Sequence, residues 1–139
     1  MRLNGSSFMP RDPRAHLLSA LDAAQAVQIF MAGRRREDYD HDRLLRSAVD
    51  REFEIVGEAL NRLRRDDPAV AQHIPGVAAI IGFRNVLVHG YDIVDRDAVW
   101  TAITVEIPAL VATITALLAE LDAAAGSGPG SGGHDPARE

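Results

Sequence analysis

Apolar residues that recur every three or four positions are the feature that most constrains this chain. The longest such stripe lies between residues 44 and 63, and the charged run RRDDP follows it. This spacing places side chains on one side of an α-helix, and charged residues followed by Pro typically end a helix. The sequence therefore predicts a long amphipathic helix whose buried side is formed by Leu44, Leu45, Ala48, Val49, Phe53, Val56, Ala59, Leu60 and Leu63.

The same periodicity occurs on both sides of this helix. The first stripe follows Asp12 as N-cap and Pro13 as first helical residue, and it stops at Gly33. The last stripe follows Asp95 or Asp97 as cap, and Pro108 should kink or break that helix. The first stripe comprises Leu17, Leu21, Ala24, Val27 and Met31, and the last comprises Trp100, Ile103, Ile107, Leu110, Ile114, Leu117 and Leu121.

The segments between the stripes complete the predicted fold. GRRREDYDHD is predicted to be a charged connection, PAVAQHI a short helical turn, and Pro75 opens a further apolar helix. No stretch alternates apolar and polar residues as a half-buried strand would. We therefore predict an all-α bundle of about four main helices plus a short helical turn.

The bundle is predicted to occupy only part of the chain. Residues 1–10 are expected to be a disordered extension, with Met1 or Met9 as the true start, and residues 11–124 the helical domain. Residues 125–139 are rich in Gly and Ser, cannot bury apolar area, and are expected to be a flexible tail.

Composition excludes several classes of protein. The absence of cysteine excludes disulfides, thiolate zinc sites and a cysteine nucleophile, and it favours the cytoplasm as location. The net charge of −5 argues against a globally basic nucleic-acid coat. The apolar run near the C-terminus carries Glu106 and Pro108, so we expect no transmembrane helix, and the N-terminus shows no secretory signal. No histidine has neighbours at metal-ligand spacing, so no metal site is predicted.

The stretch IGFRNVLVHGYDIVD (residues 81–95) places polar residues in an apolar helix. Arg84 and Tyr91 share one side of the helix two turns apart, and Asn85 and His89 form an i, i+4 pair beside them. A helix apolar on nearly every side belongs in the middle of a bundle or at a subunit interface. A guanidinium held there must meet a carboxylate, a carbonyl, a phosphate or a water-filled cleft.

Arginine and histidine together suit metal-independent RNA cleavage. Arginine neutralises a phosphate and histidine moves a proton near neutral pH, while the 2′-OH of the substrate attacks the adjacent phosphate. The spacing R-x-x-x-x-H is weak evidence, because it occurs three times in the chain. The pairs Arg11/His16 and Arg36/His41 are expected to be solvated, and only Arg84/His89 continues into H-x-Y on an apolar helix.

Structural interpretations of the same residues remain open. Arg84 could pair with a helix carboxylate such as Glu58, with His89 interacting with a helix C-terminus and Tyr91 an ordinary half-buried tyrosine. Glu58 could instead orient Arg84 or Asn85, or lie exposed. The basic runs could bind an RNA backbone or be solvated helix ends balanced by nearby acids; they comprise Arg34, Arg35, Arg36, Arg62, Arg64 and Arg65.

Three blocks of the sequence resemble one known family. DPRAHLLSALDAAQAVQIF, RLLRSAVDREFEIVGEALNRL and GFRNVLVHGYDIVDRDAVWTAITVEIPAL are similar to the HepT-like toxins of the HEPN superfamily. The resemblance covers roughly residues 11–122, and RNVLVHGY matches the R-x4-H-x-Y motif of that family without a departure.

The resemblance implies a HEPN-type homodimer and a specific activity. Arg84 and His89 would be catalytic residues of a metal-independent ribonuclease, in a cleft between the subunits, with Asn85 in support. The protein would be the toxin of a type VII toxin–antitoxin system, acting on RNA without a cofactor. Its partner would be an MntA-type nucleotidyltransferase antitoxin that attaches AMP to Tyr91. AMP there would compete with RNA phosphate for Arg84 and so switch the toxin off.

Two other function classes stay open. The chain could be a non-catalytic helical module that docks on a nucleotidyltransferase, which the acidic net charge suits slightly better. Binding of a small molecule or nucleotide within the bundle is a weaker alternative.

Overall fold

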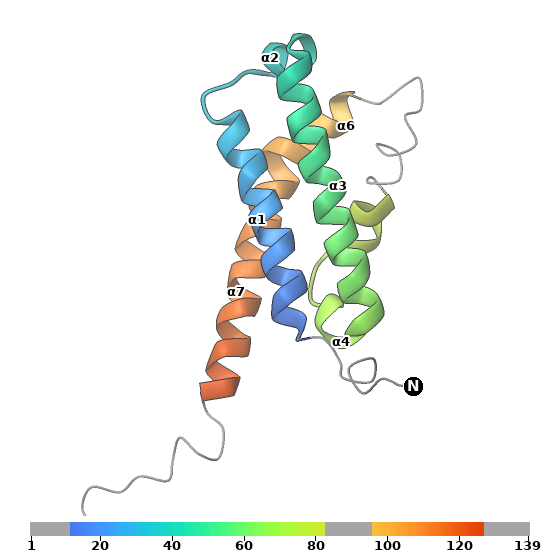
Figure 1. The fold of residues 1–139 in the computed structure, drawn as a ribbon, viewed down its shortest axis with the longest axis vertical. Helices are drawn as coiled ribbons and strands as arrows, with labels where there is room; N and C mark the ends of the chain where they lie inside the picture. The colour runs from blue at the N-terminus through green and yellow to red at the C-terminus, as the bar shows by residue number, and fades with distance from the viewer. Residues whose placement is uncertain (1–11, 83–95, 127–139) are drawn as a thin grey trace, which may run out of the picture.

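The computed structural model describes residues 12–82 and 96–126, and these residues form helices and connections without a strand (Figure 1). Residues 77–82 are also helical. The remaining elements, in chain order, are α1 (Pro13–Met31), α2 (Arg36–His41), α3 (Arg43–Asp66), α4 (Pro68–Ala71), α6 (Arg96–Thr101), the π-helical turn η2 (Ala102–Glu106) and α7 (Ile107–Gly126). The predicted all-helical class is confirmed for the described residues.

The first helix begins and ends as its sequence predicts. The Asp12 carboxylate accepts the Arg14 backbone N–H, and Pro13 opens α1, where its missing N–H loses no helical bond. Two residues after Met31, Gly33 has φ of +71°, a left-handed conformation that favours glycine. These signals fix both ends of α1.

The core lies where α1 packs against α3 and α7 (Figure 1). The two neighbours run antiparallel to α1, so their apolar stripes face it along its length. Leu17 of α1, Leu60 of α3 and Ile114 of α7 are fully buried. Most of the predicted stripe of α3 is confirmed, including Leu45, but Leu44 is 81% exposed and Ala48 is only half-buried.

The predicted charged connection after α1 is partly wrong, because α2 forms within it. The Asp38 carboxylate accepts the Arg35 N–H at 2.7 Å, which caps the start of this short helix. Tyr39 is 2% exposed and donates its hydroxyl to Asp50 of α3 at 2.6 Å. One buried aromatic side chain thus anchors a segment that is otherwise charged.

The last helix is continuous from Arg96 to Gly126, although Pro108 lies within it. The predicted irregularity is the π-helical turn η2 directly before that proline, where the Ile107 N–H bonds to the Ala102 carbonyl five residues back. The wider turn accommodates a residue that lacks an N–H.

This helix is also long and apolar enough, by length and composition, to cross a membrane, and it is the one such helix in residues 12–82 and 96–126. Glu106 and Pro108 lie within this helix, and the helix continues past both of them with the π-helical turn η2 as its irregularity. Length and composition are weak evidence for a membrane span, because core helices of soluble proteins also meet them. In the most apolar stretch of this helix a third of the residues are buried, and α7 packs against α1.

The predicted domain boundaries stay predictions. The N-terminal extension and most of the Gly/Ser-rich tail lie outside the described residues, and α7 ends at Gly126.

Candidate functional site

The residues predicted to carry the chemistry lie outside the described residues. Arg84, Asn85, His89 and Tyr91 all belong to residues 83–95, which we call the motif segment. Their predicted roles therefore stay predictions. The structure describes the chain on both sides of the motif segment, namely residues 77–82 before it and α6 after it.

The helix that leads into the motif segment is covered on one side. It begins after Gly76, whose φ is +72°, and the Ile80 N–H bonds back to the Gly76 carbonyl at 3.0 Å. Ile81 is buried, whereas Ala78, Ala79 and Gly82 are exposed. The sequence predicted a place in the middle of the bundle or at a subunit interface, and residues 77–82 have one side against the core and the other exposed in the single chain.

An apolar groove of about 300 Å³ lies between this segment and the last helix. Ala79 and Ile80 line one wall, and Ala109 and Leu110 line the other. The charged residue in its lining is Glu106, and no arginine is among the described residues that line it. Any positive charge that attracts a phosphate to this region must therefore come from elsewhere, and Arg84 of the motif segment is the predicted source.

Glu58 lies on α3 with its side chain 38% exposed. Its carboxylate accepts from Arg62 Nε at 3.1 Å, an i, i+4 pair within the helix. The sequence left open whether Glu58 is exposed or orients Arg84 or Asn85, and a half-exposed side chain is compatible with both. The supporting role of Glu58 stays a prediction.

His16 was expected to be solvated, and that prediction is wrong. Its side chain is 7% exposed, and Nε2 lies 2.8 Å from the Asp66 carboxylate. The pair joins the start of α1 to the end of α3. A sequence signal was present, because His16 directly precedes Leu17, the first residue of the apolar stripe, and so lies beside the buried side of the helix.

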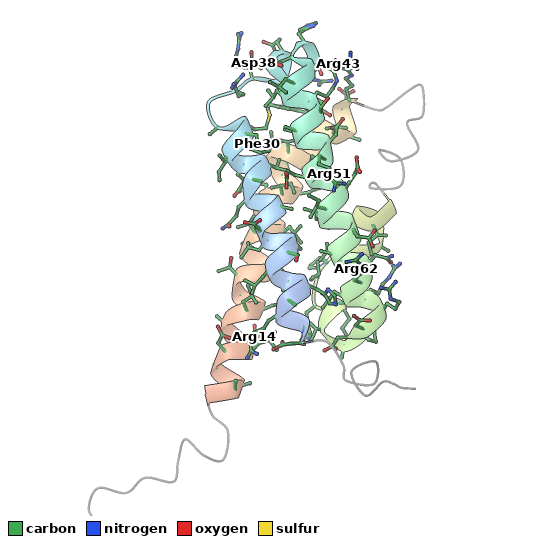
Figure 2. All side chains as sticks on the ribbon, viewed as in Figure 1. Arg14, Phe30, Asp38, Arg43, Arg51 and Arg62 are labelled. Carbon is green, nitrogen blue, oxygen red and sulfur yellow. The ribbon has the colours of Figure 1, made fainter. Side chains whose placement is uncertain are left out.

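A second groove, of about 210 Å³, opens beside His16 between α1 and α3. Its arginines are balanced by carboxylates, with Arg51 3.4 Å from Glu54 and Arg62 3.1 Å from Glu58. Both arginines are labelled on α3 in Figure 2. Because each cation has an acidic neighbour, this groove has no concentrated positive charge for a nucleic acid.

The other predicted basic positions are similarly paired. Arg34 and Arg35 lie within 4 Å of Asp42 and Glu37, and Arg65 lies within 4 Å of Asp66. Arg64 donates to the side-chain oxygen of Asn61 at 3.3 Å. This pattern favours solvated helix ends over an RNA-binding surface.

Sequence reasoning missed a polar network that joins α2, α3 and α6. The Tyr39–Asp50 hydrogen bond forms its centre, and burial raises the pKa of the Asp50 carboxyl and of the Tyr39 phenol above their ordinary values. Arg46 of α3 and Arg96 of α6 donate to the backbone carbonyl of Asp40 at 2.7 and 3.0 Å. Arg36, expected to be solvated, pairs with Asp97 of α6 and with Asp40.

The described part of the chain contains no candidate metal site. No group of three or more His, Asp or Glu side chains there could hold an ion.

Comparison with known proteins identifies relatives over most of the chain. A family profile described as "Ribonuclease HepT-like" matches residues 20–117, a range that includes the motif segment. A protein of Methanocaldococcus jannaschii named "Putative RNase MJ1216" is 31% identical over 98 residues, which are 70% of this chain and 80% of that protein. "Probable ribonuclease HepT" of Thermococcus cleftensis is 28% identical over 102 residues, or 73% of this chain and 92% of that protein.

A longer relative shares only one part with this chain. "Gamma-glutamylcyclotransferase and putative RNase MJ0434" of Methanocaldococcus jannaschii is 27% identical over 114 residues, which are 82% of this chain. The chain spans about half the length of that relative, with 51% covered. No solved structure matches the chain.

Proposed function

Because the chain belongs to the HepT-like ribonuclease family, we propose that it cleaves RNA as the toxin of a type VII toxin–antitoxin pair, in the cytoplasm. The observation that carries this proposal is the family match over residues 20–117, which includes an intact R-x4-H-x-Y motif at residues 84–91. Arg84 and His89 are the proposed catalytic residues, and Asn85 and Glu58 the supporting ones.

The proposed reaction needs no nucleophile from the protein. The substrate 2′-OH attacks the adjacent phosphorus, the bond from phosphorus to the 5′ oxygen breaks, and a cyclic phosphate and a free 5′-OH result. His89 moves the proton between the attacking and leaving oxygens, and Arg84 neutralises the charge that develops on the phosphate. Such proton transfer contributes about 10²- to 10⁴-fold to a rate.

We further propose that the active form is a homodimer. Between Ile107 and Ala119 the last helix carries no charged residue, and Pro108, Ala112 and Ala116 on its outer side are exposed. This outer side adjoins the apolar groove beside residues 74–80. A second copy that covered both would bring the two motif segments toward one another and create the crevice in which the paired arginines and histidines bind RNA.

The catalytic assignment is tested with Arg84→Ala and His89→Ala. Purified parent is incubated with labelled RNA in EDTA, and we expect cleavage by the parent and a loss of about 10²-fold or more in each variant. Arg51→Gln is the control, because Arg51 is 67% exposed and pairs with Glu54 of the same helix, and it should cleave like the parent. Equal cleavage by the parent and both alanine variants would contradict the assignment.

We propose Tyr91 as the site of neutralisation by an MntA-type nucleotidyltransferase. The tyrosine oxygen would attack the α-phosphorus of ATP, lose its proton, and release pyrophosphate. The AMP left behind would carry a phosphodiester charge that would occupy Arg84, since a helix through the motif, as the sequence predicts, would put both residues on one side. Intact mass after co-expression with the transferase should rise by whole AMP units in the parent and not in Tyr91→Phe. An unchanged parent mass would exclude the modification.

The alternative is a helical module that docks on a nucleotidyltransferase without cleaving RNA. The exposed uncharged side of α7 favours it as much as it favours a homodimer, because either partner would cover that side. The RNA assay separates the two functions, because a module leaves RNA intact while still binding the transferase.

A further inference from the structure

The short helix α2 lies at the same end of the molecule as α6 (Figure 1). It is fixed to α3 rather than left as a loose connection, because the buried Tyr39 donates to Asp50 and because Arg46 donates to the Tyr39 and Asp40 carbonyls. These carbonyls belong to the last turn of α2, where helical backbone oxygens lack partners within the helix. Hydrogen bonds from Tyr39 and Arg46 therefore hold α2 against α3.

The first two residues of α6 both bind α2. Arg96 donates to the Asp40 carbonyl at 3.0 Å and to its carboxylate at 3.4 Å. Asp97 accepts from Arg36, which also lies 3.7 Å from the Asp40 carboxylate. The two contacts run in opposite senses, with an arginine from each helix meeting an aspartate of the other.

These contacts lie directly beside the motif segment in the chain. Arg96 directly follows the motif segment, so the start of α6 is also the point to which the end of that segment is attached. Residues 77–82 attach its other end to the core through the buried Ile81. The motif segment therefore joins two described parts of the chain, each of which is attached to the bundle.

From this arrangement we infer that α2 holds the start of α6 and makes Arg36, Asp40, Arg96 and Asp97 positioning residues for the reaction of the motif segment. The inference rests on the proposed ribonuclease function. These side chains touch no reacting atom in this role. They act by fixing one end of the segment that carries Arg84 and His89, and displacement of catalytic groups by about 1 Å can lower a rate about 100-fold.

The chain contains its own probe for this inference. Trp100 is the one tryptophan in the sequence, and it lies in α6, half-buried against the core. In Arg96→Gln, we expect tryptophan emission at longer wavelength and stronger acrylamide quenching than in the parent. We also expect kcat for RNA cleavage about 10- to 100-fold lower with KM unchanged, because positioning affects the chemical step rather than binding.

The matched control is Arg14→Gln. Arg14 also joins two helices, donating to Asp122 at 2.9 Å and to the Leu121 carbonyl at 3.1 Å, but it lies at the end of the bundle opposite Asp38 (Figure 2). It should change neither Trp100 quenching nor kcat. A charge exchange gives a rescue test, because Arg36→Asp and Asp97→Arg should each reproduce the defect, and the double variant should restore much of both signals.

Each outcome decides the inference. Unchanged Trp100 quenching in Arg96→Gln would overturn it, because α2 would then not hold α6. Changed quenching with parental kcat would overturn the positioning role. Equal defects in Arg14→Gln would indicate general loosening of the bundle and also overturn it. If the parent itself leaves RNA intact, the proposed function fails and the positioning role with it, while Trp100 quenching still decides whether α2 holds α6.

Discussion

The outer sides of α3 and α7 differ in their charge. On α3, exposed arginines pair with half-buried glutamates, as in Arg51–Glu54 and Arg62–Glu58. On α7, no charge occurs between Glu106 and Glu120, and the exposed residues there are proline, alanine and threonine. Both helices bury an apolar stripe against α1, so the core does not explain the difference. Solvent exposure accounts for the charges on the outer side of α3, and the uncharged outer side of α7 is where we propose that a second copy binds.

The largest expected effect tests the buried side of α3. Leu60 is fully buried, so Leu60→Ala removes packed methyl groups and should lower the free energy of unfolding by about 2 to 5 kcal/mol. Leu44→Ala on the same helix is the control, because Leu44 is 81% exposed, and it should change that free energy by about 0.5 kcal/mol or less. Urea unfolding followed by circular dichroism measures both. Similar losses would mean that the boundary between the two sides of α3 is misplaced.

An intermediate effect tests the outer side of α7. Ala112 is exposed in the single chain, and Ala112→Glu places a charge in the middle of the uncharged surface. If a second copy covers that surface, the dimer dissociation constant should rise at least about tenfold, because a buried charge without a partner is unfavourable.

Ser47→Glu adds the same charge to the exposed part of α3 and should leave self-association unchanged. Sedimentation velocity over a range of concentrations measures both variants. Equal dissociation constants in the parent and in Ala112→Glu would remove α7 from the proposed interface.

The smallest effect concerns the charged partner of Tyr39. Burial raises the pKa of Asp50 above its ordinary value, so the folded state binds a proton there more readily than the unfolded chain. The contribution of Asp50 to stability therefore increases as the pH falls from neutral through its raised pKa toward the ordinary value of 3.8. Asp50→Asn can still accept from Tyr39 but cannot titrate.

At neutral pH Asp50→Asn should be as stable as the parent or more stable, by about 1 kcal/mol or less. The difference should shrink as the pH falls toward 3.8, the ordinary pKa of an aspartate, as urea unfolding at several pH values would show. A difference that grows as the pH falls would contradict the raised pKa.

Sequence periodicity predicted the helices that bury a row of apolar residues. It missed the helix α2 and the buried His16, each of which depends on one contact with a residue far away in the sequence. The start of α1 at Asp12 and Pro13 and the core positions of α3 followed from local rules of capping and spacing. The helix α2 did not, because its six residues carry five charged or titratable side chains besides Tyr39, and only the distant Asp50 makes that tyrosine an anchor. His16 was misassigned for the same reason, since its partner Asp66 lies 50 residues away in the sequence.

The sequence says more about the candidate site than the structure does, because the motif residues lie outside the described residues. The R-x4-H-x-Y motif was identified from residue types and from its resemblance to a family, and the family match agrees with that resemblance. The network around Asp40 could not be predicted, because nothing in the spacing of α2 and α6 indicates that the arginine of each helix contacts an aspartate of the other.

The π-helical turn before Pro108 has a consequence for how the last helix can change. Such a turn holds one residue more than an α-helical turn. Deleting one residue from Ala102–Glu106 would let an ordinary turn form and would leave all later residues facing as they do now relative to α6. A deletion from an α-helical turn would instead rotate the residues after it by about 100°. The alanine side of α7 would therefore keep its place beside residues 74–80 after a deletion within η2, whereas a deletion between Pro108 and Ala112 would turn the rest of that side away from them.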